Sequence, residues 1–332
     1  MKILNSSKCL NVGSLNVRSF KSNEKRLTVI EDILKYNLHI LAIQETKIET
    51  EEVIEDILIG KEKNTYYSVN KEGDRHHGVG LIIRKRLPPK FAKVSDRRCK
   101  ATLKIEDINI MIIAIYAPIN SCSEKDPSER DKLYEQLGSE IKRLPNKEFL
   151  IILGDFNAKT GSGHNEFPEQ IAKYGKGFMN SSGRLLLETC LQYELVLSNI
   201  LFSHRLSHRT TWTAPYREYI THDGTYRRNP IRNQIDYILI KKQHINSLKN
   251  SRSYGGILTD TDHKLVIANF QIKTKNQHKK ATKKEPKINF SEFSKKENQI
   301  KYRNSLKLIR YTKNLTPQEK WTQIVDVLKV QM

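Results

Sequence analysis

The sequence contains few cysteines and no long apolar run. Its 332 residues include four cysteines, Cys9, Cys99, Cys122 and Cys190, none of which forms a CxxC pair. This scatter argues against a disulfide framework and against a cysteine zinc site. No segment approaches the ~20 consecutive apolar residues of a membrane helix, and the first residues lack the apolar stretch of a secretory signal. We therefore expect a protein of the nucleus, with the cytoplasm as the alternative, that does not enter a membrane.

Acidic residues are also scarce relative to basic ones. The sequence has 37 Asp and Glu against 58 Lys and Arg, which gives a formal net charge of +21. Such an excess favours a polyanionic partner, either nucleic acid or an anionic membrane surface, over a small acidic metabolite. The charge carries no information about the fold.

Short, β-branched apolar runs bounded by polar turns predict most of the regular structure. Strands outnumber helices, and the two do not alternate regularly, which favours an α/β sandwich with helices on the outer faces of sheets. The helices are predicted at residues 26–36, 129–143 and 183–191. The strands are predicted at residues 10–17, 39–43, 65–69, 79–84, 101–105, 108–115, 149–153, 210–213, 235–240 and 265–270.

The composition changes after residue 271. Residues 271–304 hold 11 Lys and Arg against 3 Asp and Glu and contain no long apolar run. We predict that residues 272–314 form a basic linker without regular structure. A helix is expected to restart at Thr316-Pro317, because Thr is a good N-cap and Pro suits the first helical position. Residues 315–332 would then be the start of a truncated helical segment.

Polar residues with metal or phosphate chemistry stand at the ends of five predicted strands. Each has a plain structural explanation when taken alone, such as a turn, a helix cap or a buried histidine with its hydrogen bonds satisfied. Together they favour a site, because loops at strand ends present side chains on a rigid frame. These residues are Asn16 with Arg18, Gln44-Glu45-Thr46, Asp155 with Asn157, Asp236, and Thr261-Asp262-His263.

This set of residues matches the needs of phosphodiester hydrolysis. An anionic phosphate repels a nucleophile, so the site needs a divalent cation and fixed donors. Carboxylate oxygens suit Mg²⁺ or Mn²⁺. A histidine oriented by a carboxylate can assist proton transfer near neutral pH. Asp262 and His263 are adjacent in the sequence, and Asp236 could orient the histidine.

In their order along the chain, these motifs resemble the endonuclease/exonuclease/phosphatase superfamily over residues 8–271. Residues 15–19, 211–213, 233–240 and 286–290 are most similar to the RTE-like branch, the apurinic-type endonuclease domains of non-LTR retrotransposons. Relatives of that branch include proteins named craniofacial development protein 2. The motifs are Asn16, Gln44-Glu45-Thr46, Ile115-Tyr116-Ala117-Pro118, Gly154-Asp155-Phe156-Asn157-Ala158, Ile235-Asp236-Tyr237 and Thr261-Asp262-His263.

The resemblance implies a DNase I-like fold, a four-layer α/β/β/α sandwich, here with a basic C-terminal extension. It also implies a metal site at one edge of two packed sheets. Glu45 would be the principal Mg²⁺ ligand, with Asn16 close to it and Asp262 completing the site. Mn²⁺ is the alternative cation, and no small-molecule cofactor is expected.

The resemblance assigns catalytic roles as well. Asp155 would hold or deprotonate the attacking water, and Asn157 would help to orient that water and bind the phosphate. Tyr116 would touch the phosphate or the leaving group. His263 would contact the scissile phosphate and would be oriented by Asp236. The products would be a DNA nick with 3′-hydroxyl and 5′-phosphate ends.

Double-stranded DNA is the partner that the resemblance implies. In a retroelement the new 3′ end primes reverse transcription, so a reverse transcriptase domain is expected in the parent element. Arg18 stands where the abasic-repair branch has an acidic residue, which favours the retroelement branch. We expect Arg18, Arg205, Arg209 and Arg228 to contact DNA, because arginines in loops suit the phosphate backbone.

Two other readings stay open at this point. A domesticated copy could bind DNA or chromatin without cutting it, and the same fold could act on an inositol phosphate or a sphingomyelin. The charge of +21 and the absence of a secretory signal count against the lipid substrates. His204 and His208 could form a metal pair, but no third ligand accompanies them, so a basic loop on DNA is the better interpretation.

Overall fold

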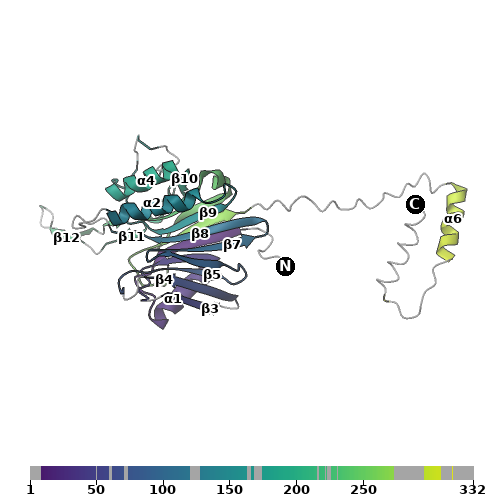
Figure 1. Cartoon of the computed structure of the whole chain (residues 1–332), viewed down its shortest axis with the longest axis horizontal. Coiled ribbons are helices and arrows are strands. Elements are labelled where there is room, and N and C mark those ends of the chain that lie inside the picture. Colours follow the sequence, from purple (N-terminus) through teal and green to yellow (C-terminus); the bar gives the residue numbers. More distant parts are fainter. Residues whose placement is uncertain are drawn as a thin grey trace. The chain divides into compact units, whose positions relative to one another are not determined.

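The computed structural model falls into two units, Met1–Lys275 and Asn276–Met332. It describes residues 9–49, 51–59, 62–70, 74–119, 128–162, 166–167, 174–214, 217–220, 222, 226–229, 231–272, 295–307 and 316. The first unit contains two large β-sheets with helices on their outer faces (Figure 1). The described part of the second unit contains helix α6 (Lys296–Lys307).

The first sheet has seven strands, in the spatial order β16-β17-β1-β2-β5-β4-β3. Its central pair, β1 and β2, is parallel, and the other pairs are antiparallel. In chain order its strands are β1 (Cys9–Asn16), β2 (Ile40–Gln44), β3 (Glu52–Ile59), β4 (Glu62–Val69), β5 (Val79–Arg84), β16 (Leu248–Tyr254) and β17 (Leu265–Gln271).

The second sheet has six strands, in the order β10-β15-β9-β8-β7-β6. Strands β8 and β9 form its parallel pair. In chain order its strands are β6 (Lys90–Ser95), β7 (Arg98–Ile105), β8 (Ile108–Tyr116), β9 (Phe149–Asp155), β10 (Leu195–Leu197) and β15 (Asp236–Lys241).

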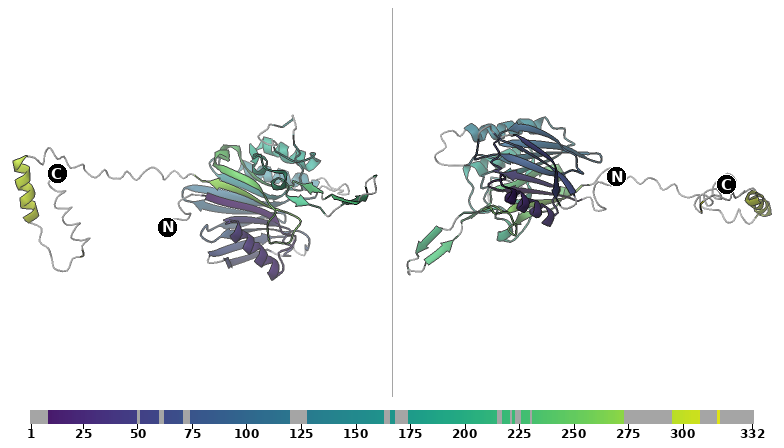
Figure 2. Two further views of the ribbon diagram at one scale, coloured as in Figure 1. Left: turned by 180° about the vertical axis from the view of Figure 1, so that it is seen from behind. Right: turned by 90° about the horizontal axis from the view of Figure 1, so that it is seen from below.

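Two small sheets lie between β10 and β15 in the sequence. Strand β11 (Trp212–Thr213) pairs with β14 (Arg232–Asn233), and β12 (Arg217–Ile220) pairs with β13 (Tyr226–Asn229). Together they form a two-stranded ribbon that extends from the sandwich (Figure 2). Short 3₁₀ helices, η1 (Ser198–Ile200), η2 (Leu206–His208) and η3 (Lys242–Ser247), complete this part of the chain.

Three helices cover the outer faces of the two sheets (Figure 1). Helix α1 (Asn23–Lys35) packs on the first sheet through Val29 and Ile33. It begins at the N-cap Ser22, whose side chain accepts a hydrogen bond from the Lys25 amide, as N-cap serines commonly do. Helices α2 (Ser128–Lys142) and α4 (Ser181–Gln192) pack on the second sheet. The four layers are therefore α/β/β/α, as the sequence predicted.

Alternation along the strands explains both the core and the position of the polar residues. Side chains of a strand point alternately to opposite faces of its sheet. On β9, Ile151 and Leu153 belong to the core between the sheets, whereas Leu150 and Ile152 face α2 and α4. By the same parity, Asp155 lies on the inter-sheet face at the end of its strand.

The other strands repeat this arrangement. Asn16 lies on the same face of β1 as Val12, which packs between the two sheets. Asp236 likewise lies on the same face of β15 as Ile238. Tyr116, at the end of β8, itself belongs to the core between the sheets. Polar side chains from four strands therefore converge on one edge of the seam between the two sheets.

Most predicted elements are present, with ends shifted by a few residues. The sequence did not reveal β3, β6, β10, β12, β13, β14 and β16, which are short, polar or at sheet edges. The predicted linker without regular structure, residues 272–314, is wrong for residues 296–307, which form α6. The remainder of that linker beyond Ile272, apart from Lys295, and the predicted helix after Thr316 lie outside the described residues. No helix in the described part of the chain combines the length and apolarity needed to cross a membrane.

Candidate active site

Asn16 joins two carboxylates that come from different sheets. Its Nδ2 donates hydrogen bonds to Glu45 Oε1 at 2.9 Å and to Asp155 Oδ2 at 3.1 Å. Its Oδ1 accepts a hydrogen bond from the Arg18 amide at 3.0 Å. Because Asn16 is fully buried, its amide is fixed in place and holds Glu45 close to Asp155.

Glu45 is presented by an unusual backbone conformation directly after β2. Its φ is +52°, a left-handed value that non-glycine residues seldom adopt and that is often found at functional sites. Tyr116 donates its hydroxyl hydrogen to Glu45 Oε1 at 3.1 Å, and Lys47 Nζ lies 3.7 Å from Glu45 Oε2. Burial and the nearby carboxylates Glu45 and Asp155 raise the pKa of Tyr116, so its phenol keeps its proton and remains a donor.

Asp155, Asp236 and His263 form a buried group at the centre of the site. Asp155 and Asp236 are cross-strand partners between β9 and β15. His263 Nδ1 donates to the two Asp236 carboxylate oxygens at 3.0 and 3.1 Å, and His263 Nε2 lies 3.8 Å from Asp155 Oδ2. The side chains of all three are at most 5% exposed. The imidazole therefore lies between two carboxylates.

Burial and charge shift the pKa values of this group upward. Burial and the neighbouring Asp236 carboxylate raise the pKa of Asp155 to about 7, although His263 opposes the shift. Burial alone would lower the pKa of His263, but Asp236 outweighs it through its charge and its hydrogen bonds, with help from Asp155 and Asp262, and raises that pKa to about 9. Near neutral pH, His263 is therefore a proton donor, and Asp155 can take up a proton.

The donor set fits a hard divalent cation. Asp155 and Asp236 offer carboxylate oxygens, and with His263 their ligand atoms all lie within 4.8 Å of one another; while it is protonated, His263 itself cannot be a ligand. Glu45 adds a carboxylate whose orientation Asn16 and Tyr116 fix. Oxygen ligands of this kind suit Mg²⁺ or Mn²⁺. A cation would also relieve the repulsion between buried carboxylates, which is otherwise costly.

Asn157 and Gly154 flank Asp155 and give the loop its shape. The Asn157 amide donates to Asp155 Oδ1 at 2.9 Å, and its Nδ2 donates to the Ala117 carbonyl at 2.8 Å. Asn157 has a φ of +47°, which asparagine tolerates better than most residues. A Cβ atom on Gly154 would lie 1.9 Å from the carbonyl oxygen of Ile115, so only glycine lets β8 and β9 approach this closely.

Asp262 lies at the flank of the buried group. Its Oδ2 accepts a hydrogen bond from Trp212 Nε1 at 3.0 Å, and its Oδ1 lies 3.7 Å from Arg18 Nε. Backbone pairing between Trp212 and His263 attaches the ribbon to the same segment. Asp262 thus connects the base of the ribbon to the candidate site. Its part in holding a metal remains a prediction.

The loop that carries Thr261, Asp262 and His263 is fixed by helix α1. Buried Asp32 accepts hydrogen bonds from the Leu258 amide at 2.8 Å, the Thr259 amide at 3.0 Å and the Thr259 hydroxyl at 2.7 Å. Thr261 Oγ1 donates to the Asn16 carbonyl at 2.8 Å. Sequence reasoning missed Asp32 because it lies within a helix, far from every motif. Its buried position on α1, between exposed Glu31 and the core residue Ile33, was the available signal.

The arginines expected to contact DNA occupy different settings. Arg18 lies beside Asp262, with a φ of +58°. Arg205 is exposed at the start of η2, and Arg209 follows η2 and is half-buried. Arg228 is on β13, but its side chain lies outside the described structure.

The two histidines near Arg205 and Arg209 make local contacts: His204 Nε2 lies 2.9 Å from Asn250 Oδ1, and His208 Nδ1 lies 3.3 Å from the Ser253 carbonyl.

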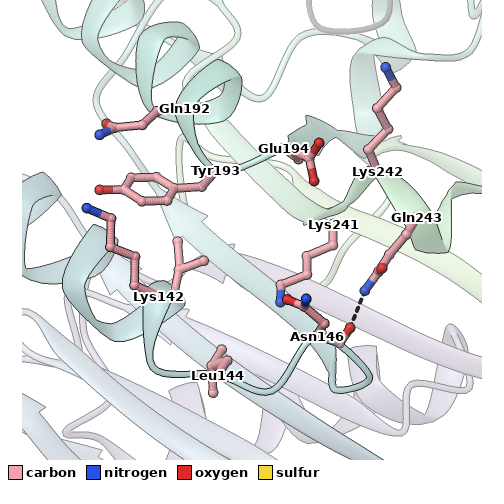
Figure 3. A pocket seen from close by; sticks show the side chains of 10 residues that line it. Lys142, Leu144, Asn146, Gln192, Tyr193, Glu194, Lys241, Lys242 and Gln243 are labelled. Carbon is pink, nitrogen blue, oxygen red and sulfur yellow. Dashed lines mark hydrogen bonds between the residues drawn. The ribbon is translucent and has the colours of Figure 1, made fainter.

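A surface pocket lies at the other ends of the strands that carry the site (Figure 3). It is formed where β9 and β10 begin and where β15 ends, whereas Asp155 and Asp236 lie at the opposite ends of β9 and β15. Gln243 Nε2 donates to the Asn146 carbonyl at 2.5 Å across it. Its lining includes Lys142, Tyr193, Glu194, Lys241 and Lys242, and no predicted site residue.

Comparison with known proteins agrees with this geometry. Residues 13–263 match the model of the endonuclease/exonuclease/phosphatase family. The chain is 31% identical over 268 residues to craniofacial development protein 2 of Bos taurus, covering 80% of this chain and 41% of that relative. It therefore spans about two fifths of that protein's length.

Two solved structures share the fold. The endonuclease domain of TRAS1, a telomere-specific non-LTR retrotransposon, superposes with a TM-score of 0.53 at 13% identity, covering 80% of this chain and 100% of that domain. The 3′ phosphatase NExo from Neisseria, bound to a product DNA hairpin, gives a TM-score of 0.54 at 19% identity and covers 79% and 100% of the two chains. At these identities the likeness shows the shared fold.

Proposed function

The chain belongs to the endonuclease/exonuclease/phosphatase family, and from this premise we propose that it is a divalent-metal-dependent endonuclease that hydrolyses phosphodiester bonds of double-stranded DNA. The proposed products are nicks with 3′-hydroxyl and 5′-phosphate ends. The observation that carries the proposal is the position of His263 between Asp236 and Asp155. A proton donor and a proton acceptor thus stand side by side, beside a carboxylate that can hold a cation.

Glu45 would hold the cation, with Asn16 close to it and Asp262 completing the site, and Asn16 would keep Glu45 close to Asp155. Mg²⁺ is the proposed ion, with Mn²⁺ as the alternative, because the donors are hard oxygens. When bound, the cation would neutralise charge on the phosphate that is attacked. Tyr116, which donates to Glu45 at 3.1 Å, is placed to contact the phosphate or the leaving group.

Asp155 and His263 would share the proton chemistry. Asp155 would orient the attacking water and accept its proton, since burial and Asp236 raise its pKa to about 7 and a base works best with a pKa near the operating pH. His263 would donate a hydrogen bond to the scissile phosphate through Nε2, since Nδ1 is held by Asp236. Asn157 would help to bind the phosphate.

The biological setting is proposed on the same basis. The likeness to a retrotransposon endonuclease domain supports target-site nicking in a retroelement, with a reverse transcriptase domain elsewhere in the parent element. A nuclear location and DNA contacts by Arg18, Arg205, Arg209 and Arg228 accompany that proposal. The net charge of +21 supports a nucleic-acid partner.

Nicking of supercoiled plasmid in Mg²⁺ tests the proposal. We expect conversion to open circles that stops with EDTA and with Asp155→Ala. Asp131→Asn, which removes a half-exposed charge on α2, is the matched control and should nick like the wild type. Absence of nicking with DNA binding intact would instead support an inert DNA-binding protein.

A further inference from the structure

A group of cations adjoins the active site, and no described residue forms an ion pair with any of them. We call Lys159, Lys176, Arg209, Arg232 and Lys264 the cation surface. Lys264 directly follows His263, and Lys159 comes two residues after Asn157. None of the ion pairs among the described residues involves the five side chains of the cation surface.

The hydrogen bonds of this group go to neutral oxygens. Lys176 Nζ donates to the Arg232 carbonyl, and Arg209 Nη1 donates to the Tyr174 carbonyl at 3.5 Å. Lys264 Nζ donates to the Ser207 carbonyl at 2.9 Å and to the Thr210 hydroxyl at 2.6 Å. These bonds fix the side chains but leave the positive charge uncompensated.

The cations are close enough to disturb one another. Burial and the charges of the other four members lower the pKa of Lys176. The Nε of Arg209 is buried without a hydrogen-bond partner in the described part of the chain. Four of the five side chains are half-buried and Arg232 is exposed. Holding like charges together in such positions is unfavourable, so an anion that covers them would bind well.

Phe178 stands beside this surface and is 93% exposed. Its loop is fixed at both ends: the Tyr174 amide donates to the Ile200 carbonyl at 3.0 Å, and the Asn180 amide donates to the Lys159 carbonyl at 3.0 Å. Gly177, just before it, has a φ of +72° and open space around its Cα. A loop held at both ends by these hydrogen bonds therefore presents an aromatic ring to solvent, two residues after Lys176.

We propose that the cation surface binds the phosphate backbone of duplex DNA beside the cleavage point, and that Phe178 stacks against a base exposed by local opening of that duplex. Cations bind phosphates without regard to sequence, whereas an exposed phenylalanine is the kind of side chain that stacks on bases or enters base steps. The proposed function supplies the ligand, duplex DNA. The consequence is a preference for DNA that is already unpaired or distorted next to the nick.

The cation surface is tested by the salt dependence of binding. We would measure binding of the full chain to a 30-base-pair duplex in EDTA, which removes cleavage, across a range of salt concentrations. The slope of log affinity against log salt is negative, and each phosphate contact contributes ~0.9 to its magnitude. The triple variant Lys159→Gln, Lys176→Gln, Arg232→Gln should therefore make the slope shallower by about 2 to 3. The matched control neutralises the exposed residues Lys104, Lys132 and Lys147, and should leave the slope close to that of the wild type. Equal slopes for the two triple variants would overturn the proposal.

Phe178 is tested with a fluorescent base. The duplex carries 2-aminopurine at successive positions around the nicked bond, and its fluorescence rises when the base unstacks. We expect a rise at one position with the wild type, none with Phe178→Ala, and recovery with Phe178→Trp. Binding by Phe178→Ala should be about tenfold weaker, the usual scale of a base–aromatic stack. If Phe178→Ala gives the same fluorescence rise and the same affinity as the wild type, the proposed role of Phe178 is overturned.

Plasmid nicking separates this inference from the proposed function. A wild type that nicks, together with a cation variant of unchanged salt slope, would refute only the cation surface. A wild type that binds DNA through these cations but does not nick in Mg²⁺ would refute only the endonuclease. Lack of DNA binding by the wild type would refute both.

Discussion

The active site and the cation surface both collect like charges, but the two groups differ in how those charges are met. Asp155 and Asp236 are fully buried neighbours, and His263 between them supplies a compensating positive charge. In the cation surface, Lys176, Arg209 and Lys264 are half-buried and donate hydrogen bonds to neutral oxygens, whereas Arg232 is exposed. Asp155 and Asp236 thus have an internal countercharge in His263, whereas no described ion pair supplies one to the cation surface.

The two regions also differ in what positions their side chains. Strand parity places Asn16, Asp155 and Asp236 in the seam between the sheets, so their arrangement follows from regular structure. Lys159 and Lys176 lie in loops, held by a few backbone bonds. A metal cation bound at the active site and a DNA phosphate bound at the cation surface would carry opposite charges. This contrast predicts that chemistry and DNA affinity can be changed separately.

The largest expected effect is on chemistry alone. Asp155→Asn should slow nicking by about 10³-fold, within the range for loss of a general base, because the amide cannot accept the water's proton. Affinity for the duplex in EDTA should stay equal or increase, because a negative charge near the phosphate is removed. Single-turnover nicking and equilibrium binding on the same preparation measure both. A large loss of affinity would show that the two regions cannot be separated.

The second effect concerns the protonation of His263. Its pKa of about 9 lies above the ordinary value of 6.5, so protonated His263 stabilises the folded state fully below pH 6.5. That contribution is lost as the pH rises through about 9. Asp236→Asn removes the main cause and should lower the pKa. We would follow the imidazole proton shifts of the metal-free protein against pH and assign them with His263→Gln. Titration at the same pH in the wild type and in Asp236→Asn would contradict the assigned cause.

A smaller effect is expected from the support beneath the site. Asp32→Asn keeps the volume but places an amide against three donors, from Leu258 and Thr259. We expect a loss of about 1–3 kcal/mol in the free energy of unfolding, the usual cost of a buried group left unsatisfied. Nicking should slow by about tenfold, with the salt slope of binding unchanged. Denaturant unfolding and nicking rates measure these, with Glu31→Gln, exposed on the same helix, as the control.

The smallest effect is expected where the two regions meet. Trp212→Phe keeps an aromatic ring but removes the indole hydrogen bond to Asp262. For a partly exposed hydrogen bond worth about 0.5–1.5 kcal/mol, nicking should slow by a few-fold. The KM for a short duplex and its salt dependence should not change. A change in the salt slope would assign Trp212 to the DNA-binding surface instead.

The sequence predicted the motifs of the site more completely than their environment. Glu45 and Asp155 were found because each follows an apolar run, and Asp236 and His263 because each stands just before one. The left-handed conformations of Arg18, Glu45 and Asn157 could not be foreseen, since none of these residues is glycine. Of the ribbon strands, β11 falls within the predicted strand 210–213, whereas β12, β13 and β14 were missed because their sequences are polar and lack alternation.

Residues distant in the sequence explain the remaining gaps. Asp32 and Thr259 are 227 positions apart, and no local pattern links a helix to the loop before His263. Lys159, Lys176 and Arg232 come from separate segments, so the charge count could indicate a polyanion but not where it would bind. Arg205 and Arg209 were both named because they lie in predicted loops, and only Arg209 belongs to the cation surface.

The sequence by itself determined the layered α/β class, the family and the identity of the polar residues at the strand ends, because periodicity and short motifs are local properties. Tertiary structure decided which of those residues meet. Pairing of β9 with β15 brings Asp155 opposite Asp236, and packing of the two sheets brings Asn16 to Asp155. Such contacts depend on strand order and register, and these are set by the burial of whole faces rather than by any single segment.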